Sequence, residues 1–504
     1  MGGIGVEQRM KILRQAAEQQ MLKPLQTHGW SAAITAEAEQ GEYLVVRAEK
    51  AGAEHKVALL YTSATANSVY KHLDTIVEHI FTNGELYKIE SYAYGIAVPV
   101  QPIDEFFPLL VAWNQKLAPG GDAARRRLVR PSTVRHITSE DPLAGIWLRL
   151  DQFQSVRLAA KLVARRAAEG SVELTEAASR SKAEGVSYSI RNASDYFRRA
   201  SGESLNKRIL SFYYGSLSLA FAEMLASPAG PIDLDELEGM TKQGHGLYTL
   251  TVGETLGDLW VGALDRGFFP QWALFLGHDV SAYPKKKPKG ASDIAETPPN
   301  TVLAIPGLFG RLPEIDDLFA EVFDLSPSWF VPLYDTDSNP SLVSLWKTER
   351  PKQDSTYLNL LDPSGRTSVD AVKASPWGFV ELTVKKADAD GKWYRARLDH
   401  AGFEYWHEAL PIHHSPFLNR ASIILPIFGS IGEYRVIGFT ILYALSILVR
   451  YMPSLWRRIE GGDADEHLAV VQATLDVLER VLPEEFLESI LRERVHVRQP
   501  GRMF

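Results

Sequence analysis

Hydrophobic residues in the first 120 positions follow helical and strand-like patterns in turn. Apolar side chains recur at helical spacing over residues 6–26, which predicts an amphipathic helix. Two more helices are expected over residues 68–81 and 103–113. The expected strands are residues 43–48, 57–62 and 86–92, the first two joined by a turn at Gly52. The order α-β-β-α-β-α predicts a small α/β domain.

Helical patterns dominate the rest of the chain. Residues 187–225 carry an apolar face on which Phe212 and Leu217 are expected to be buried. Residues 378–398 alternate like a β-hairpin, with Asp390-Gly391 at its tip. Residues 277–306 look like a loop. Further helices are expected over residues 153–168, 313–323, 434–450, 467–481 and 484–494.

A polar, Arg-rich stretch that opens with Pro119 is the best domain boundary in the chain. We therefore expect an α+β protein of two domains. Residues 1–118 would form the α/β domain, 119–187 a linker and a bridging helix, and 188–504 a mainly α-helical domain with a β-hairpin insertion.

An apolar stretch at residues 421–449 resembles a membrane segment at first sight. Glu433 and Arg435 interrupt it, and the run that remains is shorter than the roughly 20 residues that span a bilayer. We interpret it as a buried core helix and expect no membrane partner. The chain contains no cysteine and begins with a charged helical pattern, which predicts a cytoplasmic protein.

The formal net charge of −8 disfavours a protein that depends on general contacts with phosphate backbones. Local basic patches keep nucleic-acid contact open as a less favoured prediction. One is Lys285, Lys286, Lys287 and Lys289, in a Pro-rich loop. The other is Arg125, Arg126, Arg127, Arg130 and Arg135.

The N-terminal pattern invites comparison with nucleases of the PD-(D/E)XK type. These enzymes need one acidic residue and then an acid-x-Lys on the next strand, because carboxylates hold the divalent metal and the lysine stabilises developing charge. Glu42, Glu54 and Lys56 are the catalytic candidates, with Glu42 and Glu54 as ligands of Mg²⁺. Against this, Glu54 and Lys56 fall at the mouth of a hairpin, where charged residues are usually solvated.

Residues from about 190 to 495 resemble the YaaC-like family. The resemblance rests on an ordered series of segments: the helix from Leu205 to Ala220, His245-Gly246-Leu247, the run from Arg311 to Phe319, and the run from Leu442 to Tyr451. It implies a bacterial protein without an established activity. The first 120 residues lie outside the resemblance.

The Tyr213-Tyr214-Gly215 helix followed by His245-Gly246 is also similar to HEPN-type helical domains, many of which act in toxin and phage-defence systems. Their ribonuclease signature is an Arg with a His four to six residues later at a helix end. Arg130 with His136, and Arg395 with His400, have the spacing but not the predicted helix. A HEPN ribonuclease is therefore disfavoured.

Polar residues on otherwise apolar elements are candidates to line a pocket that binds a substrate or ligand. They are Arg208, Tyr213, Tyr214, His245 and Arg450. A structural hydrogen-bond network is the alternative, and the favoured one.

Standard metal and nucleotide motifs do not account for the remaining polar residues. His400, His407, His413 and His414 match no zinc spacing. Asp388 with Asp390, and Asp335 with Asp337, lack the rest of a calcium loop. Phosphate-binding and nucleophile-elbow motifs are absent.

The leading hypothesis is an interaction or scaffold component of a bacterial defence or stress-response system, with a protein partner or a second copy of itself. The metal-dependent nuclease is the alternative, and a nucleotide-sensing module in the helical half is a third. Whether the protein is an enzyme stays open, as does any cofactor other than Mg²⁺ for the nuclease.

Overall fold

The computed structural model divides into two compact units, Met1–Ala123 (unit 1) and Ala124–Phe504 (unit 2). The division falls inside the Arg-rich stretch that the sequence marks, although residues 114–133 are not among those that the structure describes. Described are residues 5–498 without 28–29, 51, 85, 104–105, 107–108, 111–112, 114–133, 201, 340–353, 374, 376, 389–390 and 404.

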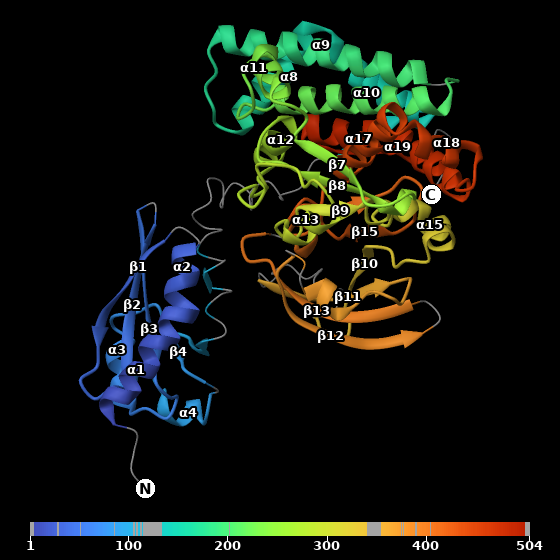
Figure 1. Cartoon of the computed structure of the whole chain (residues 1–504). Coiled ribbons are helices and arrows are strands. Elements are labelled where there is room, and N and C mark those ends of the chain that lie inside the picture. The colour runs from blue at the N-terminus through green and yellow to red at the C-terminus, as the bar shows by residue number, and fades with distance from the viewer. Residues whose placement is uncertain are drawn as a thin grey trace. The chain divides into compact units, whose positions relative to one another are not determined.

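Unit 1 is built on a five-stranded mixed sheet of order β1-β2-β3-β4-β5 (Figure 1). The first three strands form an antiparallel meander, and β4 and β5 each lie parallel to the preceding strand. The strands are β1 (Ser31–Glu37), β2 (Tyr43–Lys50), β3 (Ala53–Leu60), β4 (His79–Thr82) and β5 (Val100–Pro102). The helices are α1 (Val6–Ala17), which continues through a π-helical turn (Glu18–Leu22) into α2 (Lys23–Thr27), then α3 (Asn67–Leu73) and α4 (Ile89–Tyr92).

Helices cover both faces of this sheet because successive side chains of a strand point to opposite sides. Leu44 and Val46 of β2 pack in the hydrophobic cluster that contains Leu13 of α1. Val45, between them, packs in the cluster that contains Tyr70 of α3. The central strands are therefore buried on both sides.

Two of the predicted elements of unit 1 are wrong, and the strands β1 and β5 were missed. The helix expected over residues 103–113 lies largely outside the described residues. The helix expected over residues 68–81 ends at Leu73, and Ile80 and Phe81 are buried in β4 instead. The strand expected over 86–92 is a loop followed by α4. Strand β1 escaped prediction because Ser31–Glu37 is a mostly exposed edge strand with a weak apolar pattern.

Long helices form one side of unit 2, where α9 and α10 lie side by side (Figure 1). Apolar residues of α8, α9, α10, α17 and α19 join one large hydrophobic cluster. The helices are α7 (Pro142–Asp151), α8 (Val156–Glu169), α9 (Glu176–Ala200), α10 (Leu205–Ala226), α11 (Leu234–Lys242), α12 (Phe268–Leu276), α13 (Ala291–Glu296), α14 (Ile305–Phe309), α15 (Asp316–Phe323), α16 (Val369–Lys373), α17 (Tyr434–Tyr451), α18 (Pro453–Gly461) and α19 (Glu466–Leu491), with 3-10 turns at Gln152–Gln154, Leu256–Asp258, Pro313–Ile315 and Trp406–Glu408.

The predicted hairpin is part of a larger sheet. Strands β12 and β13 pair as expected, and β13 also pairs with β11, so that six antiparallel strands follow the order β12-β13-β11-β10-β15-β14. A second sheet has the order β7-β8-β9, and β6 pairs with β16 in parallel. The strands are β6 (Val134–Thr138), β7 (Leu247–Thr251), β8 (Leu259–Ala263), β9 (Val302–Ala304), β10 (Trp329–Tyr334), β11 (Ser355–Asp362), β12 (Phe379–Asp388), β13 (Gly391–Asp399), β14 (Ile412–His414), β15 (Ala421–Ile424) and β16 (Arg494–Arg498).

The mixed α+β architecture of the prediction is confirmed, with changes of detail. Residues 134–187 contain α7, α8 and the start of α9, which pack in the core of unit 2 rather than forming a linker. Residues 277–306, expected as a loop, contain α13 and β9. The two helices expected around Pro483 are the single helix α19.

Helices α10 and α17 are long and apolar enough to cross a membrane by length and composition alone. However, 67% and 72% of their most apolar windows are buried inside the structure, as expected for core helices. Phe212 of α10 is fully buried, as predicted. Leu217 is only partly buried, because it lies at the edge of the packed face.

Candidate functional site

A tight loop before β7 holds His245 in a fixed position. The carbonyl oxygens of Gly244 and His245 accept hydrogen bonds from the first N–H groups of α12, those of Phe268 at 3.0 Å and Phe269 at 2.9 Å. These N–H groups have no partner within their own helix. Gly246 has φ +75°, and a Cβ there would lie 2.3 Å from Cδ of Pro270. The loop therefore requires glycine beside His245.

His245 contacts the buried hydroxyl of Tyr213 on α10. The Tyr213 hydroxyl lies 2.8 Å from Nδ1 of His245, and the Tyr213 ring packs against Phe439 and Tyr443 of α17. Burial raises the pKa of Tyr213 far above its usual value. Burial, followed by the charge of Arg450, lowers the pKa of His245. At neutral pH the hydroxyl therefore donates to Nδ1, and the neutral imidazole carries its proton on Nε2.

Arg450 lies in the last turn of α17 and closes the same cluster. Its guanidinium donates to the carbonyl oxygen of Ser446 at 3.0 Å, to Oγ of Ser446 at 3.2 Å and to the Tyr214 hydroxyl at 3.3 Å. All of these acceptors are neutral. Within the described part of the chain, no ion pair includes Arg450. A partly buried guanidinium without a counter-charge is suited to binding an anion.

The structure thus brings together four of the five predicted pocket residues: Tyr213, Tyr214, His245 and Arg450. Arg208 is the exception. Its guanidinium pairs with Asp476 at 2.8 Å and with Glu479 at 3.0 Å, both on α19. Its charge is therefore neutralised, and it fastens α10 to α19.

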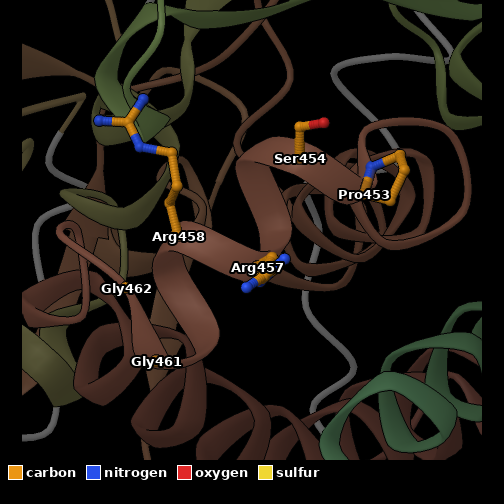
Figure 2. A pocket seen from close by; sticks show the side chains of 6 residues that line it. All are labelled: Pro453, Ser454, Arg457, Arg458, Gly461 and Gly462. Carbon is orange, nitrogen blue, oxygen red and sulfur yellow. The ribbon is translucent and has the colours of Figure 1, made fainter.

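A shallow hollow of about 600 Å³ follows one face of α18, which begins shortly after Arg450 (Figure 2). It is lined by Pro453, Ser454, Arg457, Arg458, Gly461 and Gly462. Arg458 is engaged by Asp463 and by the backbone of Glu254. Figure 2 shows Arg457 leaving the helix in a different direction. One helix alone supplies the lining, so the hollow is an open surface and not an enclosed pocket.

Glu42 does not meet Glu54 and Lys56, which corrects the predicted metal site. The backbone carbonyl of Glu42 accepts from the N–H of Tyr61, while Glu54 pairs in register with Glu49 at the far end of β2. Glu54 precedes Tyr61 by seven residues, which corresponds to about 23 Å along a strand. The two carboxylates are therefore too far apart to ligate one ion.

Other residues occupy the positions that a nuclease would need. The segment opposite Glu42 reads Leu60-Tyr61-Thr62, without an acid or a lysine. Glu54 instead pairs with Arg47 at 2.8 Å and with Lys56 at 3.2 Å. The first pair crosses from β2 to β3 and the second lies within β3, and both are exposed at the end of the hairpin, the solvated alternative that the sequence allowed.

The other polar motifs are also dispersed. His400 contacts Thr356, His413 lies between two glutamates, and His414 contacts Arg494. The described residues contain no group of three or more His, Asp or Glu side chains placed to hold a metal ion. Asp388 pairs across the turn of the β12–β13 hairpin, while Asp390 lies outside the described residues.

A buried ionic network near the start of α17 was missed by the sequence analysis. Glu223 of α10 accepts hydrogen bonds from Arg435 at 2.6 and 3.1 Å, from Trp272 at 3.0 Å and from Ser489. Glu433, two residues before Arg435, pairs with His278 at 2.9 Å. The available signal was the pair Glu433 and Arg435, two charges inside an apolar run.

His413 forms a second part of this buried polar region. Its Nε2 lies 2.9 Å from Glu314, its Nδ1 lies 2.9 Å from Glu485, and its ring stacks on Tyr434 at 4.0 Å. Tyr434 also donates to Glu314 at 2.8 Å. Residues from four elements are thereby joined around one imidazole.

Unit 2 is thus a helix-rich α+β unit in which aromatic side chains of α10 and α17 gather with His245 and Arg450. The family model for the YaaC-like proteins matches residues 151–490, more than half of the chain. The chain belongs to this family. Comparisons with curated proteins and with solved structures gave no match. The similarity to HEPN-type domains stays a prediction.

Proposed function

We propose that the protein is an interaction component of a bacterial defence or stress-response system, and that unit 2 binds an anionic group of a small ligand at Arg450. The cellular context rests on family resemblance alone. The ligand site rests on one observation: a guanidinium among Tyr214, His245 and Ser446 whose described partners are all neutral. A ligand phosphate or carboxylate would supply the missing charge.

The surroundings of Arg450 support binding more than proton-transfer chemistry. Tyr213 is fully buried, and its hydroxyl is used by His245. His245 and Tyr214 are only partly buried, so they border the accessible side of the cluster. A neutral imidazole and a phenol supply hydrogen bonds and apolar surface around one cation, which are the elements of a small-ligand site.

Exposed aromatic residues of unit 1 support an interaction role. Tyr87 and Tyr94 are 58% and 59% exposed. The backbone that carries them is fixed, because Ser63 exchanges hydrogen bonds with Tyr87 and Asn67 donates to the carbonyl of Tyr94 at 3.0 Å. Rigidly held, exposed tyrosines are characteristic of partner-binding surfaces.

Ligand binding is tested by calorimetric titration of the full chain with ATP and with inorganic phosphate. For whichever probe the parent binds, we expect Arg450→Ala to lower the affinity by about tenfold or more, because a charge-assisted hydrogen bond is lost. Arg208→Ala removes the same charge outside the cluster and should retain the parental affinity. Equal affinity in Arg450→Ala, or no binding of either probe by the parent, would contradict the site.

The interaction role is tested against the nuclease by incubating the full chain with DNA and RNA in the presence of Mg²⁺. We expect no metal-dependent cleavage by the parent and no change in Glu54→Ala or Lys56→Ala, because Glu42 lies far from both residues. Cleavage that disappears in both variants would overturn the proposal and restore the nuclease.

A further inference from the structure

The parallel pair β6–β16 presents a row of basic side chains on its outer face. Its register places His496 beside His136 and Arg498 beside Thr138. The two imidazole rings lie 5.7 Å apart, and Nη2 of Arg498 lies 3.3 Å from Nε2 of His136. His136, His496 and Arg498 are all exposed. Alternation along the strands turns Ile137 and Val495 to the opposite, buried face.

The row continues beyond the ribbon to the edge of the six-stranded sheet. Arg494, at the start of β16, lies 3.0 Å from Nε2 of His414 on β14. Basic groups of three strands are thereby linked by direct contacts. The nearby acid Glu493 is engaged elsewhere, because its carboxylate binds both Arg135 and Arg165.

Arg498 donates a hydrogen bond to Nε2 of His136, and Arg494 donates one to Nε2 of His414, so both imidazole nitrogens are acceptors and the positive charge stays on the two arginines. The described ion pairs give Arg494 and Arg498 no carboxylate partner. An anion laid across the ribbon would supply the counter-charge that these two arginines lack. The arginines are four residues apart, about 13 Å along the strand, so the row suits a chain of anions better than a single one.

We propose that the β6–β16 ribbon binds the phosphate backbone of a nucleic acid. This site is separate from the ligand site at Arg450. The net charge of −8 does not prevent this binding, because a local row of positive side chains attracts a polyanion even on an acidic protein. The ribbon is narrow and exposed, with imidazole and guanidinium groups that donate to phosphate oxygens without reading a base sequence. Binding should therefore depend strongly on salt and weakly on sequence.

The test measures fluorescence anisotropy of labelled single-stranded RNA, single-stranded DNA and duplex DNA with the full chain between 50 and 200 mM salt. We expect binding of at least one of these, with an affinity that falls linearly on a log–log plot against salt. Arg494→Ala/Arg498→Ala should weaken binding at least tenfold and reduce the salt slope by about 1.4 to 1.8, the loss of two phosphate contacts.

Lys285→Ala/Lys286→Ala is the matched control. It removes the same charge from two exposed lysines of the other basic stretch and should change neither affinity nor slope. A melting curve for each variant separates lost binding from lost folding. Binding to phosphatidylserine vesicles is measured in parallel as the alternative anionic surface. The proposal is overturned if the parent binds none of the nucleic acids at 50 mM salt, if both double variants lose affinity equally, or if the ribbon variant loses affinity for the vesicles alone.

Discussion

Replacing Glu223 by alanine is expected to lower the free energy of unfolding by about 3–5 kcal/mol, because it leaves a buried arginine without its counter-charge. Glu223 is 3% exposed, and Arg435 donates to it twice. The same substitution removes the partners of Trp272 and Ser489. Urea denaturation of the parent and the variant measures the loss.

Two further variants show whether the missing counter-charge causes the effect. Glu184→Ala removes an exposed carboxylate from an ion pair with Arg180 and should cost about 0.5 kcal/mol or less. Glu223→Leu/Arg435→Met removes both charges and should regain much of the lost stability, since apolar replacements of a buried pair are tolerated. A Glu223→Ala variant as stable as Glu184→Ala would disprove a buried ion pair.

Raising the pH from 7 to 10 is expected to remove a stabilising contribution of His413 of about 2.5 kcal/mol. Burial alone would lower its pKa, but hydrogen bonds to Glu314 and Glu485 raise the pKa of His413 to about 9. A folded-state pKa above the unfolded value of about 6.5 stabilises the protein fully below that value. The contribution is lost as the pH rises through about 9.

The measurement is the difference in unfolding free energy between the parent and His413→Gln across this pH range. Burial lowers the pKa of Lys182 to about 8, so Lys182 makes both proteins more stable as the pH rises. Because this trend is the same in both proteins, it cancels in the difference, which then reports on His413 alone. The advantage of the parent should shrink as the pH rises. A constant difference would show that His413 is neutral in the folded protein.

The sequence predicted those elements of the fold whose hydrophobic pattern is long and unambiguous. Helix α17 follows from its apolar run, and the β12–β13 hairpin follows from strict alternation. The single helix expected over residues 68–81 was wrong because a short buried strand, here β4, has the same apolar content as a turn of helix. Pro483 suggested a break, yet α19 continues through it with the proline buried on its packed face.

The site was predictable only where polar residues stood out against apolar surroundings. Tyr213, His245 and Arg450 met that condition, and the structure joins them. The order of the strands suggested that Glu42 and Glu54 lie close together. The pairing of β2 with β3 places them at opposite ends, and this register depends on the turn between the two strands, which residue spacing alone does not determine. His413, Glu314 and Glu485 come from distant segments, and nothing in any one of these segments indicates the others.

The pairing of β6 with β16 also determines when unit 2 can fold during synthesis. Arg135 of β6 and Glu493 next to β16 are 358 residues apart in sequence. At about 5–20 residues per second a ribosome needs roughly 20–70 s to make that length of chain. For that time β6 has no strand partner, and Arg135 lacks the carboxylate of Glu493. A nascent chain cut off before residue 494 should therefore keep β6 unpaired near the beginning of unit 2, where a chaperone or protease can recognise it.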